Sequence, residues 1–322
     1  MSQFYEIKVS EVSSQTRSDS IRVSVVVPTY NRPESLQACV TALLRQSYPG
    51  RNSEILIIDD GSEPALTANA LLSGGKVDSE LAEIRIIRQQ NAGPAAARNR
   101  GIREARGTLI AFTDDDCIPS PDWLSLLVQA YDETPGALLG GLTSNGLNHL
   151  LFSEASQLML DMLYRYYNRE QNSAMFLTSN NWLCAREQLL SIGAFDMQFR
   201  EAAGEDWDLC ARWREAGWNM RWVSDAMIEH RHAQRLRDFC RMHFRYGKGA
   251  YRFHKQRSVC NKRNSDSTGS FNRHLPRLIP QALQRYPSWS RRLQLLTALV
   301  IMQSSVTLGY LTASMSPTGT RQ

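Results

Sequence analysis

Apolar residues in the first half of the chain fall into short runs that alternate with segments of helical periodicity. The runs have the length of buried strands and lie at 23–27, 55–58, 84–87 and 109–112. The segments between them place apolar residues three and four positions apart and lie at 34–46, 66–72 and 95–105. This alternation predicts right-handed crossovers and a mostly parallel α/β sheet flanked by helices.

The pattern is less regular after residue 150. Apolar spacing predicts amphipathic helices at 153–167 and 206–216, and a short strand at 221–223. From 255 to 280 the composition turns to Ser, Asn, Arg and Pro, which predicts a loop or linker. This half therefore gives no regular order of strands and helices.

One mostly apolar stretch, 293–311, lies near the end of the chain and follows Arg291 and Arg292 directly. It carries no charge, but a bilayer span needs about 20 apolar residues, so its length is marginal. A membrane-attached helix and a helix packed on the rest of the chain both fit this pattern. We favour attachment, because the two arginines and the basic segment 231–263 would then lie on the same side of the membrane.

Composition places the chain among ordinary globular proteins. With 42% apolar and 21% charged residues it can bury a full core, which excludes a disordered chain. The net charge of +5 is concentrated in the basic segment 231–263, where the acid is Asp238. This segment is either a solvated helix face or a surface for anionic lipid or phosphate. No nucleic-acid-binding motif accompanies it, so we expect no nucleic acid partner.

Cysteine spacing and the N-terminal residues bear on the compartment. The six cysteines are scattered without a C-x-x-C pair, so neither a zinc site nor a disulfide framework is expected, and free thiols fit a reducing compartment. Residues 1–20 are polar and lack the apolar run of a signal peptide. These features predict a cytoplasmic protein, in which the apolar stretch 293–311 would provide attachment to the inner face of the cell membrane.

Polar clusters follow three of the predicted strands, at 28–32, 59–62 and 114–116. Ligands of open α/β sheets gather at the carboxyl ends of the strands, so the three clusters are expected to form one site. The third cluster is Asp114-Asp115-Asp116. Adjacent carboxylates repel one another unless a cation lies between them, and hard oxygen ligands in an incomplete set suit Mn²⁺ or Mg²⁺ held jointly with phosphates. An acidic turn that caps the next helix is the alternative.

Several short motifs occur in a characteristic order. They are 23–32 (VSVVVPTYNR), 57–62 (IIDDGS), 91–102 (NAGPAAARNRGI), 112–116 (FTDDD), 192–196 (IGAFD), 204–209 (GEDWDL) and 229–230 (EH). The ordered set closely resembles glycosyltransferase family 2 and covers about two-thirds of the chain. The resemblance implies an A-type glycosyltransferase fold, with a Rossmann-like nucleotide-binding half, an acceptor half and a helical C-terminal tail.

The resemblance also implies how a nucleotide-sugar donor and a metal would be held. The expected donor contacts are Pro28, Thr29, Tyr30, Arg32, Asp60, Arg98, Asp114 and Asp115. The expected ligands of Mn²⁺ or Mg²⁺ are Asp116, Asp114 and His230. Two of these assignments have ordinary structural alternatives, a surface ion pair for Arg98 and a purely structural role for His230.

On the acceptor side, Asp206 matches the family's catalytic base, which takes the proton of the attacking hydroxyl in an inverting transfer. Its structural alternative is a helix N-cap. The residues expected to line the acceptor pocket are Asn180, Asn181, Trp182 and Glu205. Trp182 and Trp207 would stack on sugar rings if they were not part of the core.

These observations divide the chain into four parts: an N-terminal extension 1–20, a catalytic domain 21–235, a basic helical or loop region 236–289, and an apolar helix and tail 290–322. The expected activity is a single inverting transfer from a UDP-linked sugar to a saccharide or lipid-linked acceptor, as in polysaccharide biosynthesis. The Q-x-x-R-W motif of processive synthases is not present around Arg212 or Arg221. A sugar nucleotidyltransferase and an inactive nucleotide-sugar-binding module are the alternatives.

Overall fold

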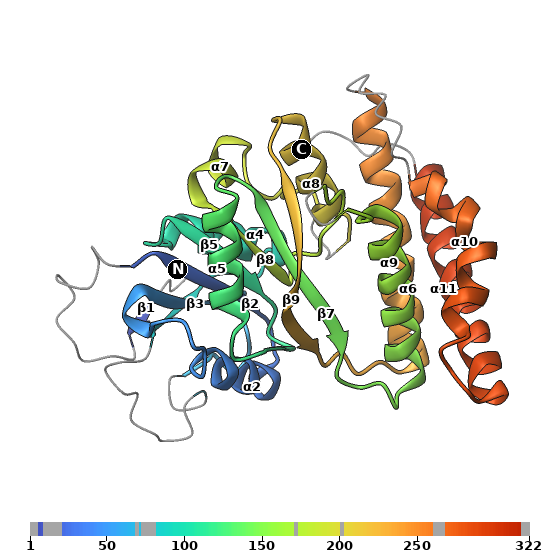
Figure 1. The fold of residues 1–322 in the computed structure, drawn as a ribbon, viewed down its shortest axis with the longest axis horizontal. Helices are drawn as coiled ribbons and strands as arrows, with labels where there is room; N and C mark the ends of the chain where they lie inside the picture. Colours follow the sequence, from blue (N-terminus) through green and yellow to red (C-terminus); the bar gives the residue numbers. More distant parts are fainter. Residues whose placement is uncertain are drawn as a thin grey trace.

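The computed structural model describes residues 6–8, 21–67, 71, 82–170, 173–199, 203–259 and 268–316. Most of the expected extension 1–20 and most of the predicted helix 66–72 lie outside the described residues. Within them, one sheet carries helices on both faces, and α6, α9, α10 and α11 stand together at one side of it (Figure 1).

The sheet has nine strands in the described residues, in the order β1-β4-β3-β2-β5-β8-β7-β9-β6. The strands are β1 Glu6–Lys8, β2 Val23–Thr29, β3 Ser53–Asp59, β4 Glu83–Arg88, β5 Leu109–Thr113, β6 Cys117–Pro119, β7 Leu138–Asn145, β8 Asn181–Ala185 and β9 Met220–His230. Strands β4, β3, β2 and β5 run parallel, which confirms the order predicted from the first half of the sequence. The sheet is nevertheless mixed, because β8 is antiparallel to both of its neighbours, β5 and β7.

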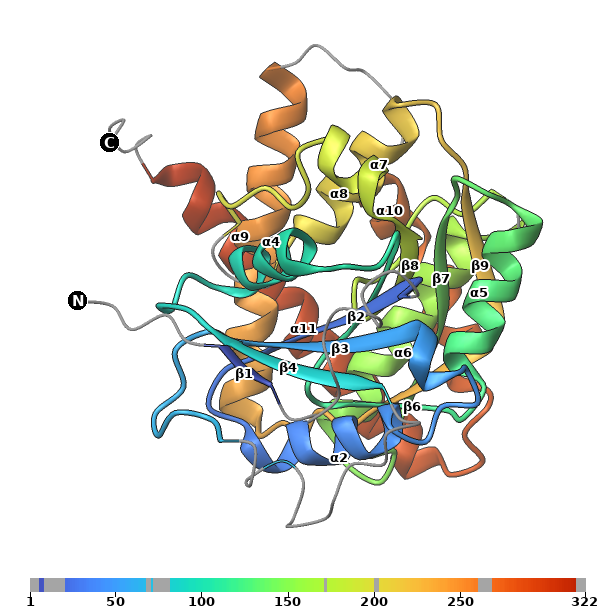
Figure 2. The same ribbon diagram turned by 90° about the vertical axis from the view of Figure 1, so that its left-hand side faces the viewer.

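The parallel strands are buried on both faces, which explains their continuous apolar runs. Val26 of β2 and Ile58 of β3 belong to the core on one side of the sheet, whereas Val25 and Ile57 belong to the core on the other side. This alternation follows from the two-residue repeat of a strand. Figure 2 shows α2 lying below these strands and α4 above them.

The helices are α2 Pro33–Leu43, α4 Pro94–Glu104, α5 Trp123–Glu133, α6 Leu151–Tyr167, α7 Arg186–Ser191, α8 Glu205–Glu215, α9 Leu236–Val259, α10 Thr268–Leu283 and α11 Trp289–Met315, with a short 3₁₀ turn at Gly50–Asn52. Pro33 and Pro94 occupy the first turns of their helices, where the missing N–H costs nothing. The predicted helices at 34–46, 95–105, 153–167 and 206–216 are therefore confirmed within a few residues.

The loop predicted for 255–280 is wrong in the described residues, because α9 continues to Val259 and α10 begins at Thr268. Pro276 and Pro280 lie inside α10. Burial of Phe271 and Leu275 in the main core offsets the hydrogen bonds that the two prolines remove. The strand predicted at 221–223 is also longer, extending as β9 from Met220 to His230.

Helix α11 contains the apolar stretch 293–311 and packs on α9 and α6. Its buried residues include Leu295, Leu299 and Met302, which belong to the main core. Among the described residues it is the helix long and apolar enough to cross a membrane, with 28% of its most apolar window buried. The helix therefore packs on the fold along one face while its other face is exposed.

Candidate active site

The expected site forms where the segments after β2 and β5 meet the end of β9. Strand β6 pairs antiparallel with β9, so that His230 lies opposite Cys117, next to the triple aspartate. The backbone N–H of Arg231 donates to the carbonyl of Asp116 at 2.8 Å, which closes this junction. The sheet thus brings together side chains that are more than a hundred residues apart in the sequence.

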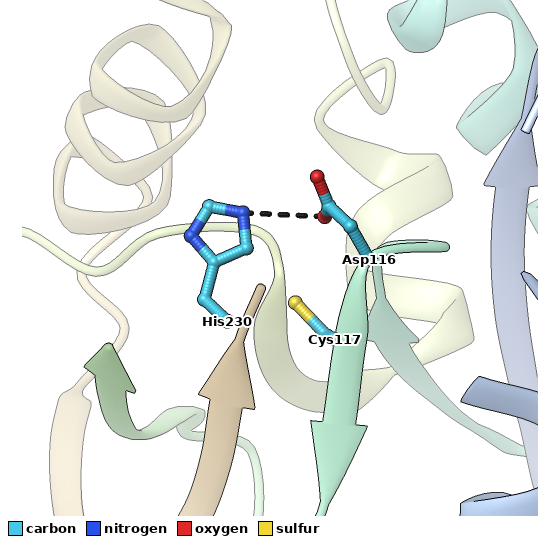
Figure 3. A group of neighbouring side chains, drawn as sticks. All are labelled: Asp116, Cys117 and His230. Atoms are coloured by element: carbon cyan, nitrogen blue, oxygen red, sulfur yellow. Dashed lines mark ion pairs between the residues drawn. The ribbon is translucent and has the colours of Figure 1, made fainter. Parts of the chain in front are cut away.

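Asp116 is buried and lies between two histidines and an arginine. His230 Nε2 lies 3.2 Å from Asp116 Oδ1, as Figure 3 shows, and His232 Nδ1 lies 3.0 Å from Oδ2. Arg32 Nη1 donates to Oδ2 at 2.9 Å. Burial would raise the pKa of Asp116, but His230, His232 and Arg32 hold that pKa well below its usual range. Asp116 is therefore an ionised carboxylate.

Asp115 joins the segment after β2 to the segment after β5. Thr29 Oγ1 donates to Asp115 Oδ2 at 2.7 Å, and Arg32 Nη1 donates to Oδ1 at 3.2 Å. Burial raises the pKa of Asp115 to about 6, although Arg32 opposes this shift. In this arrangement Asp115 positions Thr29 and Arg32 beside Asp116.

Arg98 is a buried cation between Asp114 and the acidic pair Glu205 and Asp206, and not a surface ion pair. Its Nη2 donates to Asp114 Oδ1 at 2.7 Å, and its Nη1 lies 3.6 Å from Glu205 Oε1. Burial lowers the pKa of Arg98, but Asp114, Asp206 and Glu205 more than offset this and raise it. One fixed positive charge therefore connects the triple aspartate to the acidic pair on α8.

Glu205 and Asp206 open helix α8. The N-cap position belongs to Gly204, in the left-handed conformation at φ 95°, so the N-cap alternative for Asp206 is wrong.

Asp206 Oδ2 accepts from the backbone N–H of Ser179 at 3.2 Å, while Oδ1 is buried without a hydrogen-bond partner in the described residues. Burial raises the pKa of Asp206, and burial together with the Asp206 charge raises the pKa of Glu205 to about 8. A buried carboxylate oxygen with a raised pKa and no partner suits a proton acceptor.

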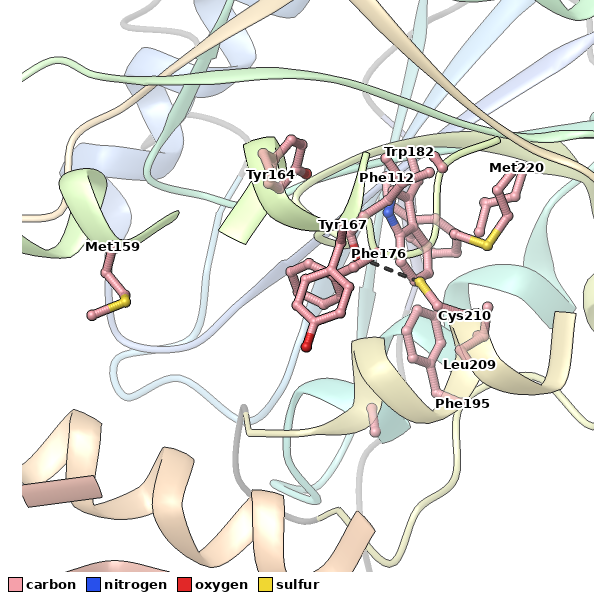
Figure 4. Packing of buried hydrophobic residues seen from close by; sticks show 14 of the residues in the cluster. Phe112, Met159, Tyr164, Tyr167, Phe176, Trp182, Phe195, Leu209, Cys210 and Met220 are labelled. Atoms are coloured by element: carbon pink, nitrogen blue, oxygen red, sulfur yellow. Dashed lines mark hydrogen bonds between the residues drawn. The ribbon is translucent and has the colours of Figure 1, made fainter. Parts of the chain in front are cut away.

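Two of the residues expected on the acceptor side are structural. Trp182 is fully buried and stacks on Phe195 with ring centroids 5.8 Å apart, in the core of Figure 4. Asn181 accepts from Trp123 Nε1 at 2.7 Å and donates to the carbonyls of Leu142 and Ala226. Adjacent positions of β8 point into the two cores, so packing and buried hydrogen bonds explain both side chains, and their contact with an acceptor stays a prediction.

The other expected residues lie nearer the site. Asn180 is almost buried and places its Nδ2 3.8 Å from Cys117 Sγ. Trp207 stacks on Phe176 with centroids 3.8 Å apart, so the core also explains this ring. Tyr30 is half-exposed beyond Thr29, in the position expected for a ring that contacts a ligand.

Asp60 holds the turn before α4. Its two oxygens accept from Gln89 Nε2 at 2.7 Å and from the backbone N–H groups of Ala92 and Gly93 at 2.9 Å. Pro28, the remaining expected donor contact, pairs with Ile58 within the sheet. Asp60 thus fixes the start of the helix that carries Arg98.

Sequence reasoning missed two residues. His232 contacts Asp116 from the position two residues after His230, and an alternating His-x-His at the end of a strand is the signal that could have found it. Tyr246 lies on α9, and burial with the charges of Glu205, Asp206, Asp114 and Asp116 raises its pKa. The residue is 41% exposed, and its ring contacts that of His243. No local motif marks it, because α9 reaches the site only through the tertiary fold.

The donor atoms fit a divalent metal. Ligand atoms of Asp116, Cys117 and His230 lie within 4.8 Å of one another. Burial and the neighbouring carboxylates raise the pKa of the Cys117 thiol well above its usual value, so this sulfur stays protonated. A carboxylate and an imidazole are ligands that Mn²⁺ accepts, and Asp116 and His230 therefore form the usable part of the set.

Comparison with known families decides the assignment. The model of glycosyl transferase family 2 matches residues 24–192, and that of glycosyl transferase family group 2 matches residues 109–318. The chain belongs to glycosyltransferase family 2. Together the two matches include the triple aspartate, the acidic pair and His230, so the sequence resemblance is confirmed.

Curated relatives support the same family. Pre-mycofactocin glycosyltransferase of Mycobacterium tuberculosis is 31% identical over 71% of this chain and 46% of its own length. Glycosyltransferase AglE of Haloferax volcanii is 37% identical over 37% of this chain and 38% of its own length. The chain thus spans less than half the length of these relatives.

Solved structures confirm the A-type glycosyltransferase fold. The mannosyltransferase PcManGT from Pyrobaculum calidifontis, in complex with GDP-Man and Mn²⁺, superposes with a TM-score of 0.61 at 18% identity, over 91% of this chain and 87% of its own. GalNAc-T7 with UDP, GalNAc and Mn²⁺ gives a TM-score of 0.50 at 15% identity, over 70% of this chain and 47% of its own. This family 2 chain therefore shares a fold with one enzyme solved with GDP-Man and Mn²⁺ and another solved with UDP, GalNAc and Mn²⁺.

Proposed function

We propose that this family 2 glycosyltransferase moves one sugar from a nucleoside diphosphate sugar, UDP-linked, to an acceptor hydroxyl with inversion at the anomeric carbon. The observation that carries the proposal is the unpartnered Asp206 Oδ1, buried beside the Arg98 bridge to Asp114. This arrangement supplies a proton acceptor on one side of Arg98 and a site for a charged leaving group on the other.

Asp116 and His230 are the residues that would hold Mn²⁺ or Mg²⁺. Asp114, the third ligand expected from the family resemblance, is bound to Arg98 in this structure and would have to turn toward the ion. The ion, when bound, supplies Lewis-acid neutralisation of the departing diphosphate. Burial lowers the pKa of His230 and Asp116 raises it by more, whereas a metal ion would bind the neutral imidazole. Thr29, Tyr30 and Arg32 lie on the nucleotide side of this group, and Arg32 is half-exposed and able to reach a phosphate.

On the acceptor side, Asp206 Oδ1 takes the proton of the acceptor hydroxyl as its oxygen bonds to the anomeric carbon. The bond from that carbon to the diphosphate oxygen breaks, and the nucleoside diphosphate leaves with the electron pair. The backbone N–H of Ser179 holds the other oxygen, Oδ2, which fixes the direction of Oδ1. Burial raises the pKa of Asp206, and the charge of Arg98 opposes that rise, which favours the ionised form that accepts a proton.

The acceptor is a saccharide or a lipid-linked saccharide, and the reaction takes place at the cytoplasmic side of the membrane. Tyr246 of α9 is 41% exposed and would offer a flat apolar face to a sugar acceptor. A single transfer fits the absence of the processive Q-x-x-R-W pattern around Arg212 and Arg221. Biosynthesis of a cell-surface polysaccharide is the setting that suits such an acceptor.

The test is a panel of nucleotide sugars incubated with the purified chain and Mn²⁺. We expect one donor to release its nucleoside diphosphate, faster when the right acceptor is added, and chelation by EDTA to stop the release. Release of pyrophosphate would instead indicate a sugar nucleotidyltransferase. Binding of a nucleotide sugar without turnover for any acceptor would favour an inactive binding module.

A further inference from the structure

Helix α11 is apolar on two opposite faces. One face, with Leu295, Leu299 and Met302, is buried against the fold. The opposite face forms an exposed stripe, the outer stripe, whose positions follow one another at intervals of three and four residues. Its members are Trp289, Leu293, Leu296, Val300, Ser304, Thr307, Leu311 and Met315. A 27-residue helix is about 40 Å long. The stripe runs along this whole length, so it is not a set of isolated exposed apolar residues.

Helix α10 extends this surface. A shallow groove of about 530 Å³ lies along the outer stripe, and Ile279 of α10 lines it together with Val300, Leu308 and Leu311. Leu308 is 59% exposed, and Val300 58%. The two helices therefore present one continuous apolar surface to solvent.

The two helices that carry this surface also carry positive charge. The sequence contains no Asp or Glu after Asp266, whereas Arg273 and Arg277 are exposed on α10. At the start of α11, Arg291 Nη2 donates to the carbonyl of Asn148, and Arg292 Nε donates to that of Tyr286. Neutral carbonyls hold these two guanidinium groups in place without cancelling their charge.

The buried face of α11 is locked onto α9 by close backbone contact. A Cβ on Gly247 of α9 would lie 1.9 Å from the carbonyl oxygen of Val306, and a Cβ on Gly309 of α11 would lie 2.0 Å from that of Phe244. A helix crossing a bilayer would have to give up this interface and the burial of Leu299 in the core. The packing therefore favours a helix that stays on the fold and exposes only its outer stripe.

We propose that the outer stripe and the arginines of α10 and α11 form a docking surface for an anionic membrane, on which α11 lies parallel to the bilayer plane. The apolar residues enter the boundary between headgroups and acyl chains, and the arginines contact anionic headgroups. A second copy of the chain fits this surface less well than a membrane does. A symmetric contact would bring the arginines of the two copies together without an acidic residue to compensate their charge. The surface lies outside the active site, so the proposal stands whether or not the proposed transfer is correct.

The apolar contribution is tested with purified full-length chain and sedimented vesicles. Wild-type protein is expected to bind vesicles of phosphatidylcholine mixed with phosphatidylglycerol more strongly than vesicles of phosphatidylcholine alone. Leu293→Glu should weaken this binding by about tenfold or more, because a 59% exposed leucine of the stripe becomes charged. Leu190→Glu is the matched control, since this leucine is 42% exposed on α7, away from the stripe, and its replacement should change nothing.

The charge contribution is tested with the double variant Arg273→Gln/Arg277→Gln. It should lose about tenfold in affinity for the anionic vesicles and keep wild-type affinity for the neutral ones. Arg45→Gln/Arg103→Gln, at exposed positions on other surfaces, is the control. Equal binding of wild type and Leu293→Glu, or no wild-type binding to anionic vesicles, overturns the proposal. A stable dimer in sedimentation equilibrium that Leu293→Glu dissociates would assign the surface to a second copy.

Discussion

At the scale of single residues, charge compensation organises the site. Arg32 and two histidines hold Asp116, while Arg98 is placed between Asp114 and the acidic pair of α8. Buried carboxylates without such partners would take up protons instead of binding a ligand. Arg32 and the histidines thus lower the pKa of Asp116, while Arg98 opposes the rise that burial causes in the pKa of Glu205 and Asp206.

Asp116→Ala should abolish the increase in nucleoside diphosphate affinity that Mn²⁺ provides. The variant removes the carboxylate on which both histidines converge, so the loss should be about 100-fold or more. Isothermal titration calorimetry with and without Mn²⁺ measures it. Asp122→Ala, an exposed carboxylate before α5, is the control. Unchanged Mn²⁺-dependent affinity in Asp116→Ala would remove Asp116 from the metal site.

Glu205→Gln should change how stability depends on pH. The pKa of Glu205 rises from 4.5 to about 8 on folding, so the folded protein keeps a proton that the unfolded chain releases within this window. Ionisation of Glu205 therefore costs stability as the pH rises through it. The Tm of the variant, without metal or nucleotide, should exceed that of wild type more at about pH 8 than at about pH 5. Glu187→Gln, at an exposed position, is the control. A difference between Glu205→Gln and wild type that stays constant with pH would contradict the raised pKa.

The sequence alone predicted the site residues that lie at the ends of strands. Thr29, Asp116 and His230 lie where a parallel sheet gathers its ligands, and the structure brings them together. The burial of Trp182 and Asn181 could not be predicted, because a tryptophan or an asparagine is typical of a sugar contact as well as of a core position. The register of β8 is what shows that both are buried. The register of a strand depends on its pairing with segments that are distant in the sequence. A local sequence pattern does not predict this pairing.

At the scale of elements, the close contact between α9 and α11 is the feature that fixes the tail. Gly309→Ala should destabilise the protein by about 1–3 kcal/mol, although alanine favours helices, because its Cβ would overlap the carbonyl of Phe244. Urea unfolding measures the effect. Ser304→Ala on the exposed stripe is the matched control and should be neutral or slightly stabilising. Equal free energies of unfolding for Gly309→Ala and Ser304→Ala would show that the two helices do not approach this closely.

The strands and helices of the first half could be predicted because their apolar repeats match their geometry, with both faces of the parallel strands buried. Helix α10 could not be predicted from the sequence, since its prolines and polar residues are typical of a loop. Its stability comes from packing Phe271 and Leu275 into the core, and that partner surface is formed by α6, more than a hundred residues earlier. Tertiary contacts overrode the local signal there.

At the scale of the whole molecule, α11 is part of the catalytic fold and not a detachable anchor. Deleting residues 289–322 should therefore leave a chain that aggregates or unfolds at lower temperature, because it uncovers α9 and the core around Leu295 and Met302. Differential scanning calorimetry of the purified fragment measures this, with a chain ending at residue 316 as the control. A truncated chain with the Tm of the control would show that the tail is dispensable for folding.

The proposed chemistry rests on one atom, Asp206 Oδ1, and Asp206→Asn tests it most directly. The amide keeps the size of the side chain and can keep the bond from the Ser179 N–H, but it cannot accept the hydroxyl proton. With the donor found in the nucleotide-sugar panel, we expect the variant to bind donor and Mn²⁺ as wild type does and to transfer the sugar about 10²–10⁴ times more slowly. Near-normal transfer by Asp206→Asn would contradict the account and move the base to another carboxylate, with Glu205 the first to examine.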